Sequence, residues 1–217
     1  MSSHHFVKDG QEPALIIANG EACSYNLLSQ LLEWCPFVVV LDGAFSRTQD
    51  LQIKTDVVIG DFDSIAEIPQ DPTITFIKID EQETTDLEKA IAYLRTKNYT
   101  DINVVWATGK RLDHTINNFS VLGMNKDLNI VLYDDYSRAF VLPNLYNKYY
   151  AANFKLSLFP IGKVTGIKTE NLQYNLNQEV LEFGQRSGSS NAVQNSGNVF
   201  VKHEKGTLIL IESKDEI

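Results

Sequence analysis

The stretch VVIGDFDSI, from Val57 to Ile65, joins an apolar run to two acids that stand one residue apart. Its β-branched residues are typical of a strand buried on both faces, as in a parallel sheet. Asp61 and Asp63 follow where that strand would end. Because ligands of open α/β sheets bind outside the carboxyl ends of the strands, the stretch predicts a fold class and a site together.

Apolar runs alternate with helix-like segments through about the first 140 residues. Besides the run at Val57, we expect strands at 14–20, 37–43, 74–80, 102–109 and 129–135. Helices are expected at 26–34 and 85–97, where apolar residues recur at helical spacing, and another is expected to open within GKRLDHTINN. This alternation predicts a mostly parallel sheet that is covered by helices on both faces.

The pattern changes after about Leu142. FKLSLFPIG, KVTGIKT, NVFVKHEKG and TLILIES are short strand-like runs separated by turn residues, and HEKG suits a hairpin loop. The segment 142–153 is interpreted as the connection between the two parts. We therefore predict an α/β domain at 1–143 and a small antiparallel β domain at 144–217.

Composition excludes several classes of function. The net charge of −9 disfavours nucleic acid or an anionic membrane as a partner, and no apolar run approaches the roughly 20 residues of a membrane helix. The start of the chain lacks the apolar core of a secretory signal, and Cys23 and Cys35 lack zinc-like spacing. We expect a cytoplasmic protein with reduced thiols, in which His4 and His5 belong to the chain terminus rather than to a metal site.

The acids of GDFDS have two interpretations. Ser64 and Glu67 match a capping box, and Asp63 would be favourable near the N-terminus of such a helix. Capping leaves Asp61 and the preceding glycine unexplained. In extended chain Asp61 and Asp63 point the same way and repel each other unless a cation lies between them. Metal binding is therefore favoured over capping alone.

A second group of acids lies in DEQETTDLEKA. Thr85 and Glu88 form another capping-box pattern, so Asp86 is either a first-turn acid or a third member of a metal site. Lys89 lies three residues further on the same helix face, where it would form a surface pair or face a phosphate. The local pattern leaves both alternatives open.

The run TGKRLDHTINN combines a glycine turn with the start of a helix, an arrangement suited to binding phosphate. Arg111 offers forked donors for phosphate oxygens, although the P-loop pattern is absent. For His114, helix capping or packing is favoured over acid–base chemistry. Carboxylates for Mg²⁺ beside basic groups indicate an enzyme of phosphoryl-type transfer that acts on a nucleotide or phosphoester, with the second substrate unnamed.

These motifs, in this order, resemble the thiamin pyrophosphokinase (thiamin diphosphokinase) family. The matching pieces are ANGE, DGA, DVVIGDFDSI, DEQETTDLEKAI, GKRLDHTINN, SLFPIG, NLQYNL and SGSSN, and they run from Asn19 to Asn191. The resemblance implies a Rossmann-like nucleotide-binding domain followed by a β-sandwich-like domain, in a homodimer. It also implies transfer of the diphosphate of ATP to the hydroxyl of thiamin, which gives thiamin diphosphate and AMP.

The resemblance also implies roles for individual residues. The catalytic positions are Asp61, Asp63, Asp86, Lys89, Arg111 and Asp113. The three acids Asp61, Asp63 and Asp86 would hold Mg²⁺ against the triphosphate, and Asp63 or Asp86 could orient or deprotonate the thiamin hydroxyl. Lys89 and Arg111 would contact phosphates. The rest of the ATP site would include Asn19, Asp42 and Gly43.

Thiamin in this family lies at the dimer interface. The resemblance places Gln82 of one chain there, opposite Tyr174, Ser190 and Asn191 of the other. The chain departs from the family pattern twice: NLQY stands where eukaryotic members have Gly-Leu-Lys-Trp, so Tyr174 replaces a tryptophan, and Lys110 replaces the second glycine of Gly-Gly-Arg. The alternatives are a pyrophosphokinase for a different alcohol, a metal-dependent phosphohydrolase and a non-catalytic nucleotide-binding module.

Overall fold

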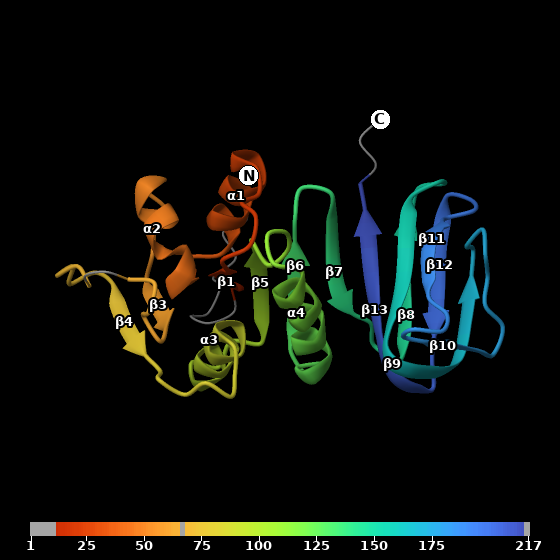
Figure 1. Ribbon diagram of the computed structural model, residues 1–217. Coiled ribbons are helices and arrows are strands. Elements are labelled where there is room, and N and C mark those ends of the chain that lie inside the picture. The colour runs from red at the N-terminus through yellow and green to blue at the C-terminus, as the bar shows by residue number, and fades with distance from the viewer. Residues whose placement is uncertain (1–11, 66–67, 215–217) are drawn as a thin grey trace. The chain divides into compact units, whose positions relative to one another are not determined.

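A computed structural model describes residues 12–65 and 68–214 of the chain (Figure 1). Contacts divide these residues into two compact units. The first contains the residues up to Asn118 together with Leu128–Asp134, and the second contains Phe119–Asp127 and the residues from Asp135 onward. Each unit is described separately.

The first unit is built on a six-stranded parallel sheet. Its strands are β1 (Ala14–Ile17), β2 (Phe37–Leu41), β3 (Val57–Gly60), β4 (Thr75–Lys78), β5 (Asp101–Val105) and β6 (Asn129–Tyr133). They lie in the order β4-β3-β2-β1-β5-β6, and each neighbouring pair is parallel. The order reverses between β1 and β5, and such a reversal is where open α/β sheets bind their ligands.

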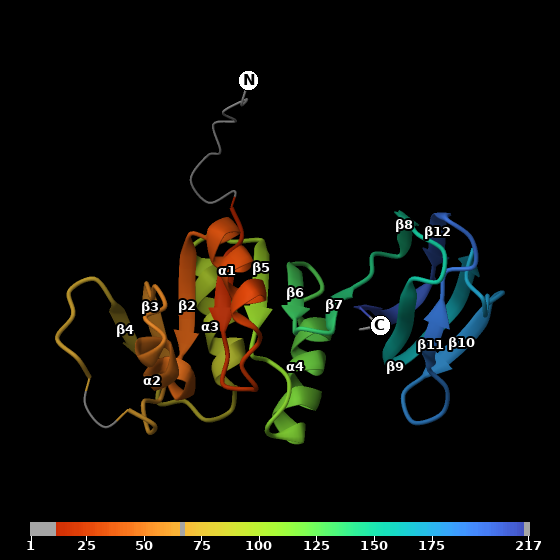
Figure 2. The same ribbon diagram turned by 90° about the horizontal axis from the view of Figure 1, so that it is seen from above.

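The described residues form the helices α1 (Tyr25–Trp34), α2 (Asp42–Asp50), α3 (Asp86–Thr96) and α4 (Leu112–Met124). In Figures 1 and 2, α1 and α2 cover one face of the parallel sheet and α3 covers the other. Leu28 of α1 and Phe45 of α2 share a core cluster with Leu15 of β1 and Val38 of β2. Because both faces are covered, β1 and β3 are buried along their whole length, as their continuous apolar sequences predict.

The second unit is antiparallel. Its strands are β7 (Ser137–Val141), β8 (Leu145–Tyr150), β9 (Lys155–Glu170), β10 (Glu179–Glu182), β11 (Gly188–Ala192), β12 (Gly197–Lys202) and β13 (Lys205–Ser213). The long strand β9 pairs with β11 and β13 along its first part and with β10 and β12 towards its end. Gly162 and Gly166 have φ of 69° and 66°, which allows β9 to bend between these pairings.

The predicted mixed α/β class is confirmed, and several details of the prediction are wrong. The segment interpreted as a connection contains β8, and the two strands expected at 154–162 and 163–169 are one strand, β9. Strands β7, β10 and β11 and helix α2 were not expected. HEKG lies at the junction of β12 and β13, but the expected hairpin is wrong, because β12 pairs with β8 and β9 whereas β13 pairs with β7 and β9.

Some predictions fall on residues that the structure does not describe. Glu67 of the first capping box lies outside the described residues, as do His4 and His5, and the described residues 61–65 contain no helix. Within residues 12–65 and 68–214, no helix is both long and apolar enough to cross a membrane.

Candidate active site

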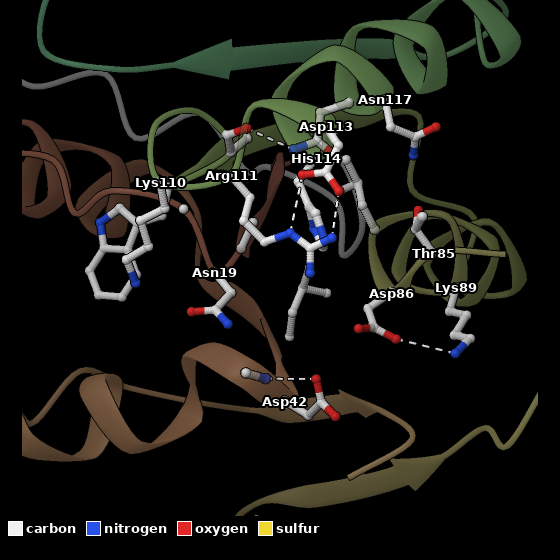
Figure 3. Close-up of a pocket in the computed structure, with 18 of the residues that line it drawn as sticks. Asn19, Asp42, Thr85, Asp86, Lys89, Lys110, Arg111, Asp113, His114 and Asn117 are labelled. Atoms are coloured by element: carbon white, nitrogen blue, oxygen red, sulfur yellow. Dashed lines mark hydrogen bonds and ion pairs between the residues drawn. The ribbon is translucent and has the colours of Figure 1, made fainter. Parts of the chain in front are cut away.

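A cavity of about 610 Å³ lies at the carboxyl ends of the parallel strands, where the strand order reverses (Figure 3). All of its lining residues belong to the first unit. The polar and charged ones are Asn19, Asp42, Asp61, Gln82, Thr84, Thr85, Asp86, Lys89, Lys110, Arg111, Asp113, His114, Asn117 and Asn118. The cavity thus brings together residues that are up to 100 positions apart in the chain, from Ala18 to Asn118.

Three carboxylates form a cluster, of which Asp42 and Asp61 line this cavity and Asp63 does not. Asp42, Asp61 and Asp63 each offer an oxygen, and these oxygens lie within 4.8 Å of one another. Oxygen ligands in such a group suit Mg²⁺, a small hard cation. Asp61 and Asp63 were expected to cluster. The structure adds Asp42 to them, while Asp86 lines the cavity outside this group of three.

Asp42 is the first residue of α2, and two backbone N–H groups hold its carboxylate. Its carboxylate accepts hydrogen bonds from the N–H groups of Gly43 (2.6 Å) and Phe62 (2.8 Å), and the residue is only 5% exposed. Burial raises the pKa of Asp42, and the charges of Asp86 and Asp61 act in the same direction, against the hydrogen bonds. Gly60 makes room for this carboxylate, because a Cβ there would lie 2.3 Å from Cγ of Asp42. The glycine before Asp61 is thereby explained.

Asp61 is oriented by two donors. Its carboxylate accepts hydrogen bonds from Nε2 of Gln82 (3.0 Å) and from the backbone N–H of Asp63 (3.1 Å), and both lower its pKa. Between the two acids, Phe62 has φ of 65°, so the chain is turned here rather than extended as expected. Gln82, expected to contact thiamin, therefore holds a carboxylate of the acid cluster in this structure.

The start of α3 contributes an acid and a buried base. The predicted capping box is confirmed, because Glu88 accepts a hydrogen bond from the backbone N–H of Thr85 (2.9 Å). Lys89 is 6% exposed, and its Nζ lies 3.2 Å from Oδ1 of Asp86. The surface-pair interpretation of Lys89 is wrong: this ammonium is buried at the wall of the cavity.

The turn before α4 presents a second base. The Arg111 guanidinium donates two hydrogen bonds to Asp113, from Nε to Oδ1 (3.1 Å) and from Nη2 to Oδ2 (2.5 Å). Hydrogen bonding to Arg111 lowers the pKa of Asp113 to about 2. Gly109 and Lys110 have φ of 74° and 50°, which makes the turn tight. His114 is exposed and lines the cavity, so the packing interpretation is wrong, whereas the helix-capping interpretation stays a prediction.

Sequence reasoning missed the two amides that follow on α4. Asn118 is buried and donates to the carbonyl of Ala107 (2.7 Å), which fixes the helix against the end of β5. Nδ2 of Asn117 is buried without a hydrogen-bond partner among the described residues. Asn117 lies four residues after Asp113, and this spacing could have predicted that both side chains lie on the same face of the helix.

The other residues expected to contact thiamin lie in the second unit. The Tyr174 side chain is prominent, because the residue is 69% exposed. Asn191 is buried, and its amide is used by the backbone of Tyr174: Oδ1 accepts from the N–H (3.1 Å) and Nδ2 donates to the carbonyl (2.8 Å). Ser190 is exposed, with φ of 58°. Asn191 thus anchors the exposed aromatic ring.

Comparison with known proteins gives a consistent result for both parts of the chain. Residues 28–132 match a family model described as the thiamin pyrophosphokinase catalytic domain. Residues 146–208 match one described as the thiamin pyrophosphokinase vitamin B1 binding domain. Together the two models of one family cover most of the chain.

Relatives and solved structures agree with these matches. The chain is 33% identical over 158 residues to thiamine pyrophosphokinase 1 of Arabidopsis thaliana, covering 65% of this chain and 59% of the relative. It is 29% identical over 181 residues to thiamine pyrophosphokinase 3 of Oryza sativa subsp. japonica, covering 76% and 64%. The chain thus spans about three fifths of the length of these plant relatives.

Solved structures show the same fold at lower identity. The thiamin pyrophosphokinase of Geobacillus thermodenitrificans has a TM-score of 0.77 at 24% identity, with 94% of this chain and 98% of the other covered. Yeast thiamin pyrophosphokinase has a TM-score of 0.78 at 16% identity, with 97% and 88% covered. From both family models, the curated relatives and the shared fold, we conclude that this chain belongs to the thiamin pyrophosphokinase family.

Proposed function

We propose that this chain transfers the diphosphate of ATP to the hydroxyl of thiamin and releases AMP. The observation that carries the proposal is that Asp42 and Asp61, which cluster with Asp63, line one cavity together with the bases Lys89 and Arg111. Phosphoryl-type transfer needs positioning and charge neutralisation more than covalent chemistry, and this set of groups supplies both.

The proposed reaction forms one bond to phosphorus and breaks another. The hydroxyl oxygen of thiamin bonds to the β-phosphorus of ATP, and the bond from that phosphorus to the oxygen shared with the α-phosphate breaks. AMP leaves with this oxygen, and the hydroxyl proton passes to a carboxylate, for which Asp63 and Asp86 are the candidates. Lys89 and Arg111 bind phosphate oxygens and oppose the charge that develops on them.

The acid cluster fits Mg²⁺. Three carboxylates with oxygens within 4.8 Å of one another repel unless a cation lies between them, and they offer the hard ligands that Mg²⁺ prefers. We assign Asp61 and Asp63 to the metal, with Asp42 and Asp86 as further ligands. When bound there, Mg²⁺ would neutralise phosphate charge and help to orient the polyphosphate.

Thiamin is assigned to the exposed ring of Tyr174, with Ser190 beside it and Gln82 as the contact from another chain. An aromatic face attracts the cationic thiazolium by about 0.5–2 kcal/mol. We propose a cytoplasmic homodimer with the active site at its interface. Its Rossmann-like nucleotide-binding domain would span 1–143 and its β-sandwich thiamin-binding domain 144–217.

One assay tests the reaction. The protein is incubated with ATP, Mg²⁺ and thiamin, and AMP and thiamin diphosphate are measured; AMP that appears only with thiamin supports the proposal. ADP or phosphate released without thiamin would indicate a phosphohydrolase, turnover with a different alcohol would indicate another pyrophosphokinase, and no turnover would indicate a binding module.

The metal assignment is tested by matched substitutions. Asp61→Asn and Asp63→Asn keep the side-chain shape and remove one charge each, and we expect each to lower kcat at least 100-fold. Asp50→Asn, an exposed acid at the end of α2, is the control and should have no effect. Near-normal turnover by either cluster variant would remove that residue from the metal site.

A further inference from the structure

Arg47 lies behind the wall of the cavity and joins three elements of the first unit. It belongs to α2, and its Nη2 donates to Oδ1 of Asn19 (3.1 Å) and to the carbonyl of Gly20 (3.0 Å), both in the loop after β1. Its guanidinium lies over the ring of Trp106, the residue that follows β5, at 4.5 Å from the ring centroid. Arg47 therefore connects α2 to the two strand ends between which the strand order reverses.

The loop that Arg47 holds is tightly packed. The N–H of Gly20 donates to the carbonyl of Trp106 (2.5 Å), and a Cβ at Gly20 would lie 2.4 Å from that same oxygen. Trp106 has φ of 56°, an uncommon conformation for a bulky residue, and is 1% exposed. With the backbone fixed on both sides, the Arg47 contacts determine how the Asn19 side chain is turned.

The contacts of Arg47 fix which end of the Asn19 side-chain amide faces the cavity. Because Oδ1 accepts from Arg47, Nδ2 is left on the other side, next to Gly43, where a built Cβ would lie 2.3 Å from it. In Figure 3 the amide nitrogen of Asn19 is turned toward the side of the cavity on which Asp42 lies. Nδ2 has no hydrogen-bond partner among the residues that the structure describes, so a donor faces the cavity.

The orientation of the Asn19 amide matters because acidic side chains line the same cavity. The acids Asp42 and Asp61 line the same cavity, and an amide carbonyl turned inward would add another acceptor beside them. An inward N–H instead donates to an acceptor-rich ligand, and polyphosphate and ribose oxygens are of that kind. The polarity of Asn19 thus distinguishes an anionic, oxygen-rich ligand from one that presents donors.

We infer that Arg47 is a positioning residue for the nucleotide: it keeps the amide N–H of Asn19 turned into the cavity and does not itself contact the ligand. Arg47 is absent from the cavity lining, whereas Asn19 is part of it. The inference rests on the proposed nucleotide substrate and gives Arg47 a role that operates only through Asn19.

A double-mutant cycle on nucleotide binding tests this role. The probe is α,β-methylene-ATP with Mg²⁺, in which the bond that would break is replaced, and its Kd is measured by calorimetry on the full chain. We expect Arg47→Met and Asn19→Ala each to raise Kd about tenfold, the effect of losing one hydrogen bond to a charged ligand. The double variant should also be about tenfold weaker, because the second change removes nothing further.

Two further variants separate positioning from stability. Asn19→Asp keeps the acceptor for Arg47 and replaces the inward donor by a carboxylate oxygen, and we expect its Kd to rise more than tenfold at an unchanged melting temperature. Arg186→Met, which removes a cation paired with Glu179 in the second unit, is the charge control and should stay within twofold of the wild type.

Several outcomes would overturn the inference. These are an Arg47→Met Kd within twofold of the wild type, losses that multiply to about 100-fold in the double variant, or an Asn19→Asp Kd like that of the wild type. Absence of analogue binding by the wild type would also overturn it. Failure of the proposed reaction has a different signature: the cycle behaves as expected, yet ATP and thiamin give no thiamin diphosphate.

Discussion

Replacing Gly60 by alanine is a direct test of how the acid cluster is built. A Cβ at this position would lie 2.3 Å from Cγ of Asp42 and 2.5 and 2.6 Å from its two carboxylate oxygens. Relaxed contacts need about 3.5 Å, so the Asp42 carboxylate has to move by roughly 1 Å. That movement breaks the hydrogen bonds that Asp42 accepts from Gly43 (2.6 Å) and Phe62 (2.8 Å).

The magnitude follows from these contacts. Hydrogen bonds to a charged group contribute about 1.5–3 kcal/mol each, and overpacking costs about 1–3 kcal/mol. Because the structure relaxes in part, we expect Gly60→Ala to lower the free energy of unfolding by about 3 kcal/mol. Asp42 would also leave Asp61 and Asp63, so the Mg²⁺ concentration for half-maximal activity should rise at least tenfold, which corresponds to about 1.4 kcal/mol.

The assay combines urea unfolding with AMP formation measured over a range of Mg²⁺ concentrations. Gly123→Ala is the matched control, because its Cβ would meet the side chains of Ile161 at 3.3 Å and Thr207 at 3.5 Å, within a helix that favours alanine. Its unfolding free energy should stay within about 1 kcal/mol of the wild type. If Gly60→Ala matched this control in both stability and Mg²⁺ dependence, the contact between Gly60 and Asp42 would not organise the cluster.

Three further predictions concern single contacts. Asn191→Ala removes both hydrogen bonds to the Tyr174 backbone, so the KM for thiamin should rise about as much as in Tyr174→Ala. The double variant should have the same KM as either single variant, and increases that multiply would contradict this. Lys110→Gly relieves a left-handed conformation (φ 50°) and should add about 0.5–1 kcal/mol to the free energy of unfolding, whereas a lower melting temperature would show that the lysine side chain stabilises the fold. Burial lowers the pKa of His203 in the folded protein below its ordinary value of 6.5. As the pH falls, the histidine is therefore protonated in the unfolded chain before it is protonated in the folded one. The free energy of unfolding is highest above about pH 6.5 and decreases as the pH drops towards the folded pKa. Unfolding measured at pH 7.5 and 5.5 should show this loss in the wild type and a smaller one in His203→Leu, and equal losses would refute it.

The sheet of the first unit could be predicted because its strands have continuous apolar sequences, which are typical of buried strands. Continuous apolar runs such as ALII of β1 and VVI of β3 are buried on both faces in the structure, as expected. Helix α2 escaped prediction because DGAFSRTQD is mostly polar, and only Ala44 and Phe45 carry its apolar contact with the sheet. Strand β8 escaped because LYNKYY follows a proline and an asparagine, which indicated a connection.

The membership of the acid cluster could be predicted only in part, and the reason is strand order. Asp61 and Asp63 were recognised as acids at a strand end, and Asp42 was expected in the ATP site, but a sequence does not state which strands are neighbours. Strand β2 lies next to β3, so Asp42, which follows β2, lies beside Asp61 and Asp63, which follow β3. Asp86 follows β4 through a further loop, and it reaches the cavity wall without joining the group of three.

The charges of the cavity explain why the proposed reaction would need a divalent cation. Four acids line it against three bases, and two of those bases are already engaged: Lys89 with Asp86 and Arg111 with Asp113. ATP would bring about four more negative charges into a chain whose net charge is already −9. Lys89 and Arg111 cannot offset that charge without giving up their present partners, and Lys110 supplies only one positive charge. A cation held by the acid cluster would therefore supply much of the compensation. The acids whose own charge opposes an anionic substrate are thus the groups that would make its binding possible.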